Sequence, residues 1–216
     1  MNNLLFRISA AFALLLLLSA SALTGAALAG TATPNAPEFR EGDILFQDTV
    51  SGQSMAIKLA TNSRYTHCAI ILQKDGRLQV FEAVSKIGWI PIETWIRRGV
   101  GGHYALMRLK DSSALTPRAL EAMRRDTANY DNKDYDLLFQ WSDEKFYCSE
   151  LVWKLYQRNA GLELGSLKRF ADYNLDHEEV RRIVRQRYGT ELPADEKVIA
   201  PSDIMEAELL ETVYQN

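Results

Sequence analysis

The most constraining feature of this sequence is a pair of apolar runs separated by a turn signal. Residues 67–73 and 78–84 are rich in aliphatic and β-branched side chains, and Asp75-Gly76 lies between them. An Asp-Gly pair flanked by apolar runs is the strongest short-range signal for a two-residue β-hairpin. The segment therefore predicts an antiparallel hairpin whose register is set by Asp75 and Gly76.

That register brings two polar side chains together. It places His67 opposite Val84 and Ala69 opposite Glu82. Because side chains alternate between the faces of a sheet, His67 and Glu82 share one face as diagonal neighbours, roughly 7–8 Å apart at the backbone. We expect Glu82 to accept a hydrogen bond from one ring nitrogen of His67 and to leave the other nitrogen free.

A cysteine lies at the start of a predicted helix over residues 148–159. Leu151, Val152 and Leu155 recur at helical spacing, and Cys148 is three residues before the first of them. The Cys148 thiol should therefore lie in the first turn, on the apolar face that packs against the sheet. Unpaired N–H groups and the helix dipole at this end favour a thiolate and can hold an oxyanion. Cys148 is thus a candidate nucleophile, with His67 as the imidazole that takes its proton.

The second cysteine, Cys68, alternates onto the face opposite His67. We expect it to be a buried apolar residue on the far side of the sheet from Cys148. Two cysteines suggest a disulfide if the chain is exported, so a Cys68–Cys148 bridge is the alternative that composition supports.

The remaining pattern indicates an α+β fold. Strands are expected early and helices later, which favours an antiparallel sheet over alternating βαβ units. The last predicted helix begins with Asp176 as N-cap and Glu179 three residues later. The further predicted segments are strands at 43–47 and 103–109 and helices at 54–61, 117–129 and 176–188.

The first 29 residues resemble an export signal. Arg7 precedes an apolar run over residues 8–18, and Ala27-Leu28-Ala29 places small residues where a signal peptidase reads. We expect cleavage after Ala29, a flexible lead-in over 30–38 and one catalytic domain over 39–216. The alternative, an uncleaved membrane anchor, needs an apolar run of about 20 residues, longer than this one. The mature protein is expected to be periplasmic or secreted.

Composition excludes several other classes of protein. The formal net charge is −3 and the basic residues are scattered, so nothing indicates nucleic-acid binding. Gly101-Gly102 precedes no Lys-Ser/Thr and no helix start, so it is not a phosphate loop. His103 and His177 lack a comparable neighbourhood, and no His, Cys or Asp set has metal-ligand spacing. We therefore expect no metal and no organic cofactor.

Four motifs together resemble a known family. They are Gly42-Asp43-Ile44-Leu45-Phe46-Gln47, Tyr65-Thr66-His67, Val80-Phe81-Glu82-Ala83 and Tyr147-Cys148-Ser149-Glu150-Leu151-Val152. This set is similar to the YiiX-like family of permuted NlpC-type papain-like enzymes, in which the cysteine helix follows the histidine strand instead of preceding it. The resemblance covers nearly the whole chain after the signal. It implies a circularly permuted papain-like fold, with Cys148 as nucleophile, His67 as base and Glu82 as the orienting residue.

The resemblance also implies the reaction class. It indicates an exported cysteine hydrolase, peptidase-like or amidase-like, that cleaves an amide or ester-like acyl bond through a Cys148 acyl-enzyme. Its expected partners are small acyl, lipid or peptide substrates, cell-wall peptides among them. Two alternatives stay open: an acyltransferase using the same triad, and a non-catalytic periplasmic binding module held by a Cys68–Cys148 disulfide.

Overall fold

The computed structural model describes residues 37–216, so the predicted signal peptide (1–29) lies outside the described residues. The strands are β1 (Ile44–Gln47), β2 (His67–Lys74), β3 (Arg77–Ala83), β4 (Ile87–Ile90), β5 (Ala105–Leu109), β6 (Lys168–Arg169), β7 (Lys197–Val198) and β8 (Leu210–Gln215). The helices are α1 (Ser54–Thr61), α2 (Ile92–Arg98), α3 (Pro117–Asp126), α4 (Cys148–Ala160), α5 (Glu178–Tyr188) and α6 (Pro201–Met205), with 3-10 turns at 100–102, 112–114, 127–129 and 170–172.

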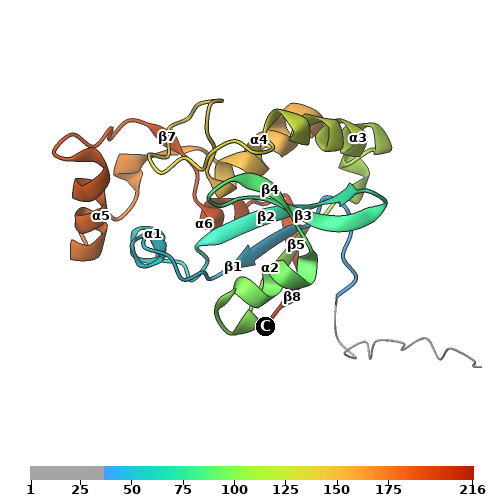
Figure 1. Cartoon of the computed structure of the whole chain (residues 1–216), viewed down its shortest axis with the longest axis horizontal. Helices are drawn as coiled ribbons and strands as arrows, with labels where there is room; N and C mark the ends of the chain where they lie inside the picture. Colours follow the sequence, from blue (N-terminus) through green and yellow to red (C-terminus); the bar gives the residue numbers. More distant parts are fainter. Residues whose placement is uncertain (1–36) are drawn as a thin grey trace, which may run out of the picture. The chain divides into compact units, whose positions relative to one another are not determined.

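The centre of the fold is a six-stranded antiparallel sheet. Its strand order is β4-β3-β2-β1-β5-β8, and a separate ribbon pairs β6 with β7. Figure 1 shows α3 and α4 above this sheet and α2 below it. The arrangement confirms the predicted α+β class and the antiparallel sheet packed against the cysteine-bearing helix.

The β2–β3 hairpin has the predicted register. Lys74 pairs with Arg77, and the ladder continues in the same register to Ile70 and Phe81. Asp75 and Gly76 both have positive φ, 51° and 75°. Two successive residues of positive φ make a type I′ turn, whose twist matches that of the flanking strands.

Two apolar layers cover the two faces of the sheet. Ile70 and Leu72 of β2 pack under α4, whose Leu151, Val152 and Leu155 are fully buried in the same cluster. The alternate residues of β2 face α2 in a second cluster, which is centred on Trp95. The sheet is therefore buried on both sides, and the α4 side forms the larger core.

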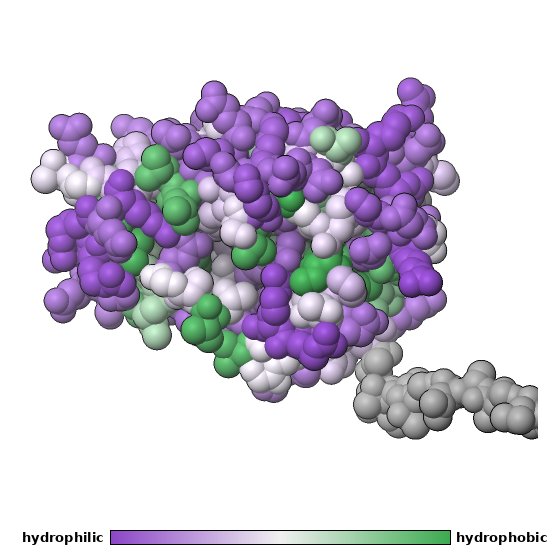
Figure 2. All heavy atoms as spheres, in the orientation of Figure 1, coloured by the Kyte–Doolittle hydropathy of each residue, from purple (hydrophilic) through white to green (hydrophobic). Residues whose placement is uncertain are grey.

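The surface shows no extended apolar belt on the face drawn in Figure 2, where apolar residues form separate patches among hydrophilic ones. Within residues 37–216, no helix is long and apolar enough to cross a membrane.

The sequence predictions were incomplete at several elements. Strands β4 and β8 and helix α2 were not predicted. Asp176 is not the N-cap of α5: the cap is His177, whose Nδ1 accepts a hydrogen bond from the Glu179 N–H at 3.3 Å. A ring nitrogen acts here as the oxygen of an aspartate or serine usually does.

The Gly-Asp motif has a structural role at the start of β1. Both carboxylate oxygens of Asp43 accept hydrogen bonds from Arg108, each at 2.7 Å, and the carboxylate also accepts from the Arg40 N–H. Gly42 has a φ of +87°, and a Cβ there would meet the Leu115 side chain at 2.4 Å. The motif therefore anchors the entry to the sheet.

We expect Asp43→Ala to lower the free energy of unfolding by about 2–4 kcal/mol, because it leaves the largely buried Arg108 guanidinium without its partner. Urea denaturation measures this change. Glu121→Ala, which breaks an exposed ion pair with Arg125, is the control and should change stability by less than about 1 kcal/mol. Equal effects of the two variants would contradict the anchoring role.

Candidate active site

Cys148 is the first residue of α4 and is 4% exposed. Glu150, two residues further along, accepts a hydrogen bond from the Tyr147 N–H, and the Ser149 hydroxyl donates to the Ile199 carbonyl at 2.7 Å. These contacts fix the start of the helix against the C-terminal segment. First-turn N–H groups have no carbonyl partner within their own helix, so they are available to an anion at this position.

His67 lies at the first position of β2, beside Glu82 of β3. The ring Nε2 and Glu82 Oε2 are 2.8 Å apart, so the predicted shared face is confirmed. Because Nε2 is engaged by the carboxylate, Nδ1 is the ring nitrogen left to exchange a proton with Cys148. The imidazole also stacks on Trp95 of α2, with ring centroids 5.9 Å apart.

Arg98, the last residue of α2, also binds the Glu82 carboxylate. Its Nη2 donates to both Glu82 oxygens, at 2.5 and 2.6 Å. Burial raises the pKa of Glu82, but the hydrogen bonds and charges of His67 and Arg98 outweigh it and lower the pKa below its ordinary value. Glu82 is therefore a carboxylate at neutral pH.

The Cys148–His67 pair is poised as thiolate and imidazolium. Burial lowers the pKa of His67, but hydrogen bonding and charge from Cys148 and Glu82 raise it to about 9. Hydrogen bonding from the Cys68 thiol lowers the pKa of Cys148 most; burial opposes this, and His67 and the Cys68 backbone add to the lowering. The result is a pKa of Cys148 well below its ordinary value.

The position predicted for Cys68 was wrong in one respect. Cys68 does alternate onto the face opposite His67, but this is the face on which α4 packs, and Cys68 and Cys148 share one apolar cluster. The helix could have covered either face of the hairpin, and the residues of the hairpin alone do not decide which. His67 still reaches Cys148 because it opens its strand. Both cysteines are free thiols.

Burial and the neighbouring Cys148 sulfur raise the pKa of Cys68 well above its ordinary value. Cys68 is therefore a neutral S–H donor and Cys148 is the charged partner. Cys68 is buried, as its position on the strand predicted, and it also makes an electrostatic contact with the candidate nucleophile.

Two cavities meet at this site. One includes Cys148 and has a mostly apolar surface, formed by residues of α1, α5 and the segments between α3 and α4 and around β7. The other is wider and more polar, and it includes His67 and Arg98. Gln53, Tyr135 and Arg187 line both cavities.

Several residues of the site follow no local pattern that indicated their role. Trp95 and Arg98 lie on a helix that was not predicted, although Ile92, Trp95 and Ile96 have helical spacing. Tyr135 lies in an irregular segment with no local pattern. Among residues 37–216, no group of three or more His, Cys, Asp or Glu side chains is arranged to hold a metal ion.

Comparison with known proteins agrees with this architecture. Residues 38–214 match the family described as permuted papain-like amidase enzyme, YaeF/YiiX, C92 family. The chain is 35% identical over 172 residues to the uncharacterized protein YiiX of Escherichia coli K12, covering 80% of this chain and 84% of that protein. The crystal structure of metalloprotein yiiX from Escherichia coli O157:H7 superposes with a TM-score of 0.78 at 34% identity, covering 82% of this chain and 97% of that one.

We expect Cys68→Ala to raise the pKa of Cys148, because it removes the thiol that stabilises the Cys148 thiolate. The measurement is the rate of Cys148 alkylation by iodoacetamide as a function of pH. In the wild type this rate should fall only when the pH drops through the lowered pKa of Cys148; in Cys68→Ala the fall should begin at higher pH. Cys68→Ser retains an O–H donor and should lie between them. Superimposable profiles for all three proteins would contradict the proposed contact.

Proposed function

The chain belongs to the C92 family of permuted papain-like amidases, and on that premise we propose that it is a cysteine hydrolase that cleaves an amide or ester-like acyl bond through an acyl-enzyme on Cys148. The observation that carries the proposal is the line of charges from Cys148 through His67 and Glu82 to Arg98. Each group lies beside one of opposite sign, so each favours the charged state of the next. A nucleophile, a base and an orienting carboxylate are the parts that acyl transfer requires.

The proposed reaction has two steps. The Cys148 thiolate attacks the acyl carbon and the carbonyl electron pair moves to oxygen. The pair then returns to re-form the carbonyl as the bond to the amine or alcohol breaks, and His67 gives its Nδ1 proton to this leaving group. In the second step His67 takes a proton from water, which attacks the thioester; the carbon–sulfur bond breaks, which releases the acid and restores the Cys148 thiolate and the protonated His67. Glu82 keeps the imidazole oriented and stabilises its positive form. An acceptor alcohol or amine in place of water would make the enzyme an acyltransferase.

The cavity beside Cys148 favours an apolar acyl group. Its lining includes Ile57 of α1, Val180 and Ile183 of α5, and the aromatic rings of Phe139 and Phe170. The surface of this cavity is mostly apolar, and the polar side chains of Gln53, Tyr135 and Arg187 that line it are bonded to one another. We therefore infer that the acyl portion enters this cavity and that the more polar leaving group lies in the wider cavity beside His67. This assignment favours lipid-like acyl substrates over cell-wall peptides.

Two further points complete the proposal. The chain is exported if residues 1–29 act as the signal that their pattern indicates.

The solved relative from Escherichia coli O157:H7 is described as a metalloprotein, whereas residues 37–216 of this chain do not form a set of metal ligands. The proposed steps use only the side chains and backbone groups of this chain.

The proposed triad predicts the order of rates among its variants. Cys148→Ser and His67→Ala should each lower kcat on an activated acyl ester by about 10⁴-fold or more, and the double variant should be little worse because the two residues act as one unit. Glu82→Gln should cost about 10- to 100-fold, since the amide oxygen still accepts from the imidazole.

The control for the carboxylate is Glu41→Gln. Glu41 also accepts a hydrogen bond from an arginine, Arg124, at 2.6 Å, but it lines neither cavity. Glu41→Gln should leave kcat within about twofold of the wild-type value, a change far smaller than the roughly 10²-fold contribution of acid–base catalysis. Unchanged turnover in Cys148→Ser would refute the mechanism.

The apolar cavity predicts that the rate depends on acyl chain length. Because each buried CH₂ contributes about 0.8 kcal/mol, octanoyl esters should exceed acetyl esters in kcat/KM by several-fold for each methylene that the cavity accepts. Ala60→Trp, which fills the cavity from α1, should abolish this preference and spare the acetyl ester. Ala122→Trp on α3 is the matched control for a large residue on a half-buried helix position. If the wild type and Ala60→Trp preferred octanoyl over acetyl esters equally, this cavity would not be the binding site of the acyl group.

A further inference from the structure

Tyr135 is brought to the active site by a contact with the residue two positions before Cys148. It forms a parallel bridge with Phe146, and the Tyr135 N–H donates to the Ser85 carbonyl at 3.2 Å. Its side chain lines the apolar cavity together with Cys148 and the polar cavity together with His67. Tyr135 is therefore shared by the two cavities, and its hydroxyl is near enough to Cys148 for the charge of Cys148 to act on it.

The hydrogen bonds around Tyr135 determine which way its hydroxyl proton points. Gln53 Nε2 is 3.1 Å from Tyr135 Oη, and Arg187 Nη2 contacts Gln53 Oε1. Because arginine has donors only, it must face the amide oxygen of Gln53, which leaves the amide NH₂ facing the tyrosine. Tyr135 Oη thus accepts from Gln53, and its own O–H is available to donate to another group.

The hydroxyl keeps its proton under the conditions of the reaction. Burial, together with the nearby Cys148 charge, raises the pKa of Tyr135 well above its ordinary value, although Gln53 and Arg187 oppose the shift. Tyr135 is accordingly a neutral donor wherever the Cys148 thiolate is formed.

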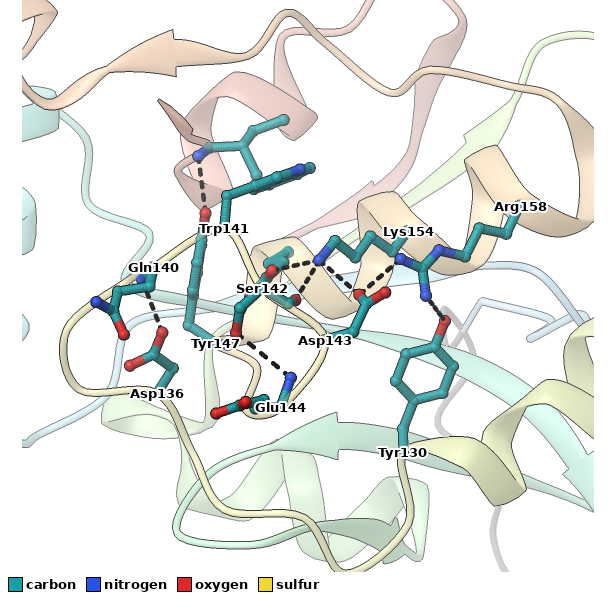
Figure 3. A network of polar contacts seen from close by, with 12 residues as sticks. Tyr130, Asp136, Gln140, Trp141, Ser142, Asp143, Glu144, Tyr147, Lys154 and Arg158 are labelled. Atoms are coloured by element: carbon teal, nitrogen blue, oxygen red, sulfur yellow. Dashed lines mark hydrogen bonds and ion pairs between the residues drawn. The ribbon is translucent and has the colours of Figure 1, made fainter. Parts of the chain in front are cut away.

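The segment that carries Tyr135 is fixed to the cysteine helix. Lys154 donates to Glu150 Oε1 at 2.7 Å and to Asp143 Oδ1 at 3.0 Å. Figure 3 shows Lys154 and Arg158 both reaching from α4 to Asp143. Further along the same segment, Asp136 accepts hydrogen bonds from two backbone N–H groups, those of Leu138 and Gln140. A donor held in place before the reaction stabilises developing charge without the cost of reorganisation.

We propose that Tyr135 is a catalytic residue whose hydroxyl donates a hydrogen bond to the oxyanion formed when Cys148 attacks the acyl carbon, together with the N–H groups at the start of α4. Gln53 and Arg187 are positioning residues that aim this hydroxyl. The inference rests on the proposed acyl-enzyme reaction. The sulfur–carbon bond forms as the carbonyl electron pair moves to oxygen; Tyr135 retains its proton throughout, and the proton for the leaving group comes from His67.

The test compares two reactions of the same thiolate. Hydrolysis of an octanoyl ester passes through an oxyanion, whereas alkylation by iodoacetamide is a displacement at a saturated carbon and forms none. Tyr135→Phe should lower kcat for the ester about 10²- to 10³-fold. It should leave the rate of Cys148 alkylation within about twofold of the wild-type rate, a change far smaller than the loss of ester turnover. Tyr130→Phe is the matched control, because Tyr130 is also a buried tyrosine with a hydrogen-bonded hydroxyl, but it lines neither cavity.

A second variant tests the aiming of the hydroxyl. Gln53→Glu replaces the donor NH₂ with an acceptor, so the Tyr135 O–H should turn toward the carboxylate and away from the substrate. Gln53→Glu should therefore lose ester turnover nearly as strongly as Tyr135→Phe, and the double variant should be no worse than either. Gln53→Leu removes the contact without capturing the proton and should cost less.

The outcomes separate this inference from the proposed function. If the wild type turns over the ester and Tyr135→Phe retains more than half of that turnover, the oxyanion role is wrong and the hydrolase proposal stands. Equal losses of hydrolysis and alkylation in Tyr135→Phe would place the effect on the thiolate and also overturn the inference. If the wild type hydrolyses no acyl ester or amide, the proposed function fails and the role of Tyr135 fails with it.

Discussion

The packing of α4 against the sheet is the constraint on which the site depends. The apolar stripe of this helix covers β2, and its first residue is therefore placed at the end of the strand that carries His67. Burial of such a stripe contributes roughly 25 cal/mol for each Å² of apolar surface removed from water. The position of the thiol is thus set by the main core of the molecule. Shifting the helix to displace Cys148 would open that core.

The electrostatics of the site follow from this burial. Cys148, His67, Glu82 and Arg98 alternate in sign, so the cluster as a whole has little net charge although each group is charged. An isolated charge at such a depth would shift its pKa and become neutral, whereas a chain of hydrogen-bonded opposite charges stays ionised. Trp95 stacks on one side of the imidazole, and Cys148 lines the apolar cavity.

Local sequence patterns predicted the parts of the site that local physics determines. Asp75-Gly76 defined the hairpin register, and that register placed His67 beside Glu82. The helical spacing after Cys148 located the thiol in the first turn of α4. These features involve residues separated by a few positions or by one tight turn, for which the side-chain periodicities are fixed.

The features that were missed depend on contacts between distant segments. Which face of the hairpin the cysteine helix covers is decided by the whole core, and so the proximity of Cys68 to Cys148 could not be read from the alternation of β2. Tyr135 and Arg98 reach the site from a loop and from a short helix on the opposite face, and their relation to it exists only in three dimensions.

The central claim is that Cys148 carries the acyl group during turnover. The most direct measurement is the mass of the protein quenched in acid during the first turnovers of an octanoyl ester, followed by peptide mapping. If Cys148 is the nucleophile, the mass increases by one octanoyl group located on the peptide that contains Cys148, and the increase disappears as substrate is exhausted. Product formation without any acylated Cys148, or acylation of another residue at the rate of turnover, would contradict it.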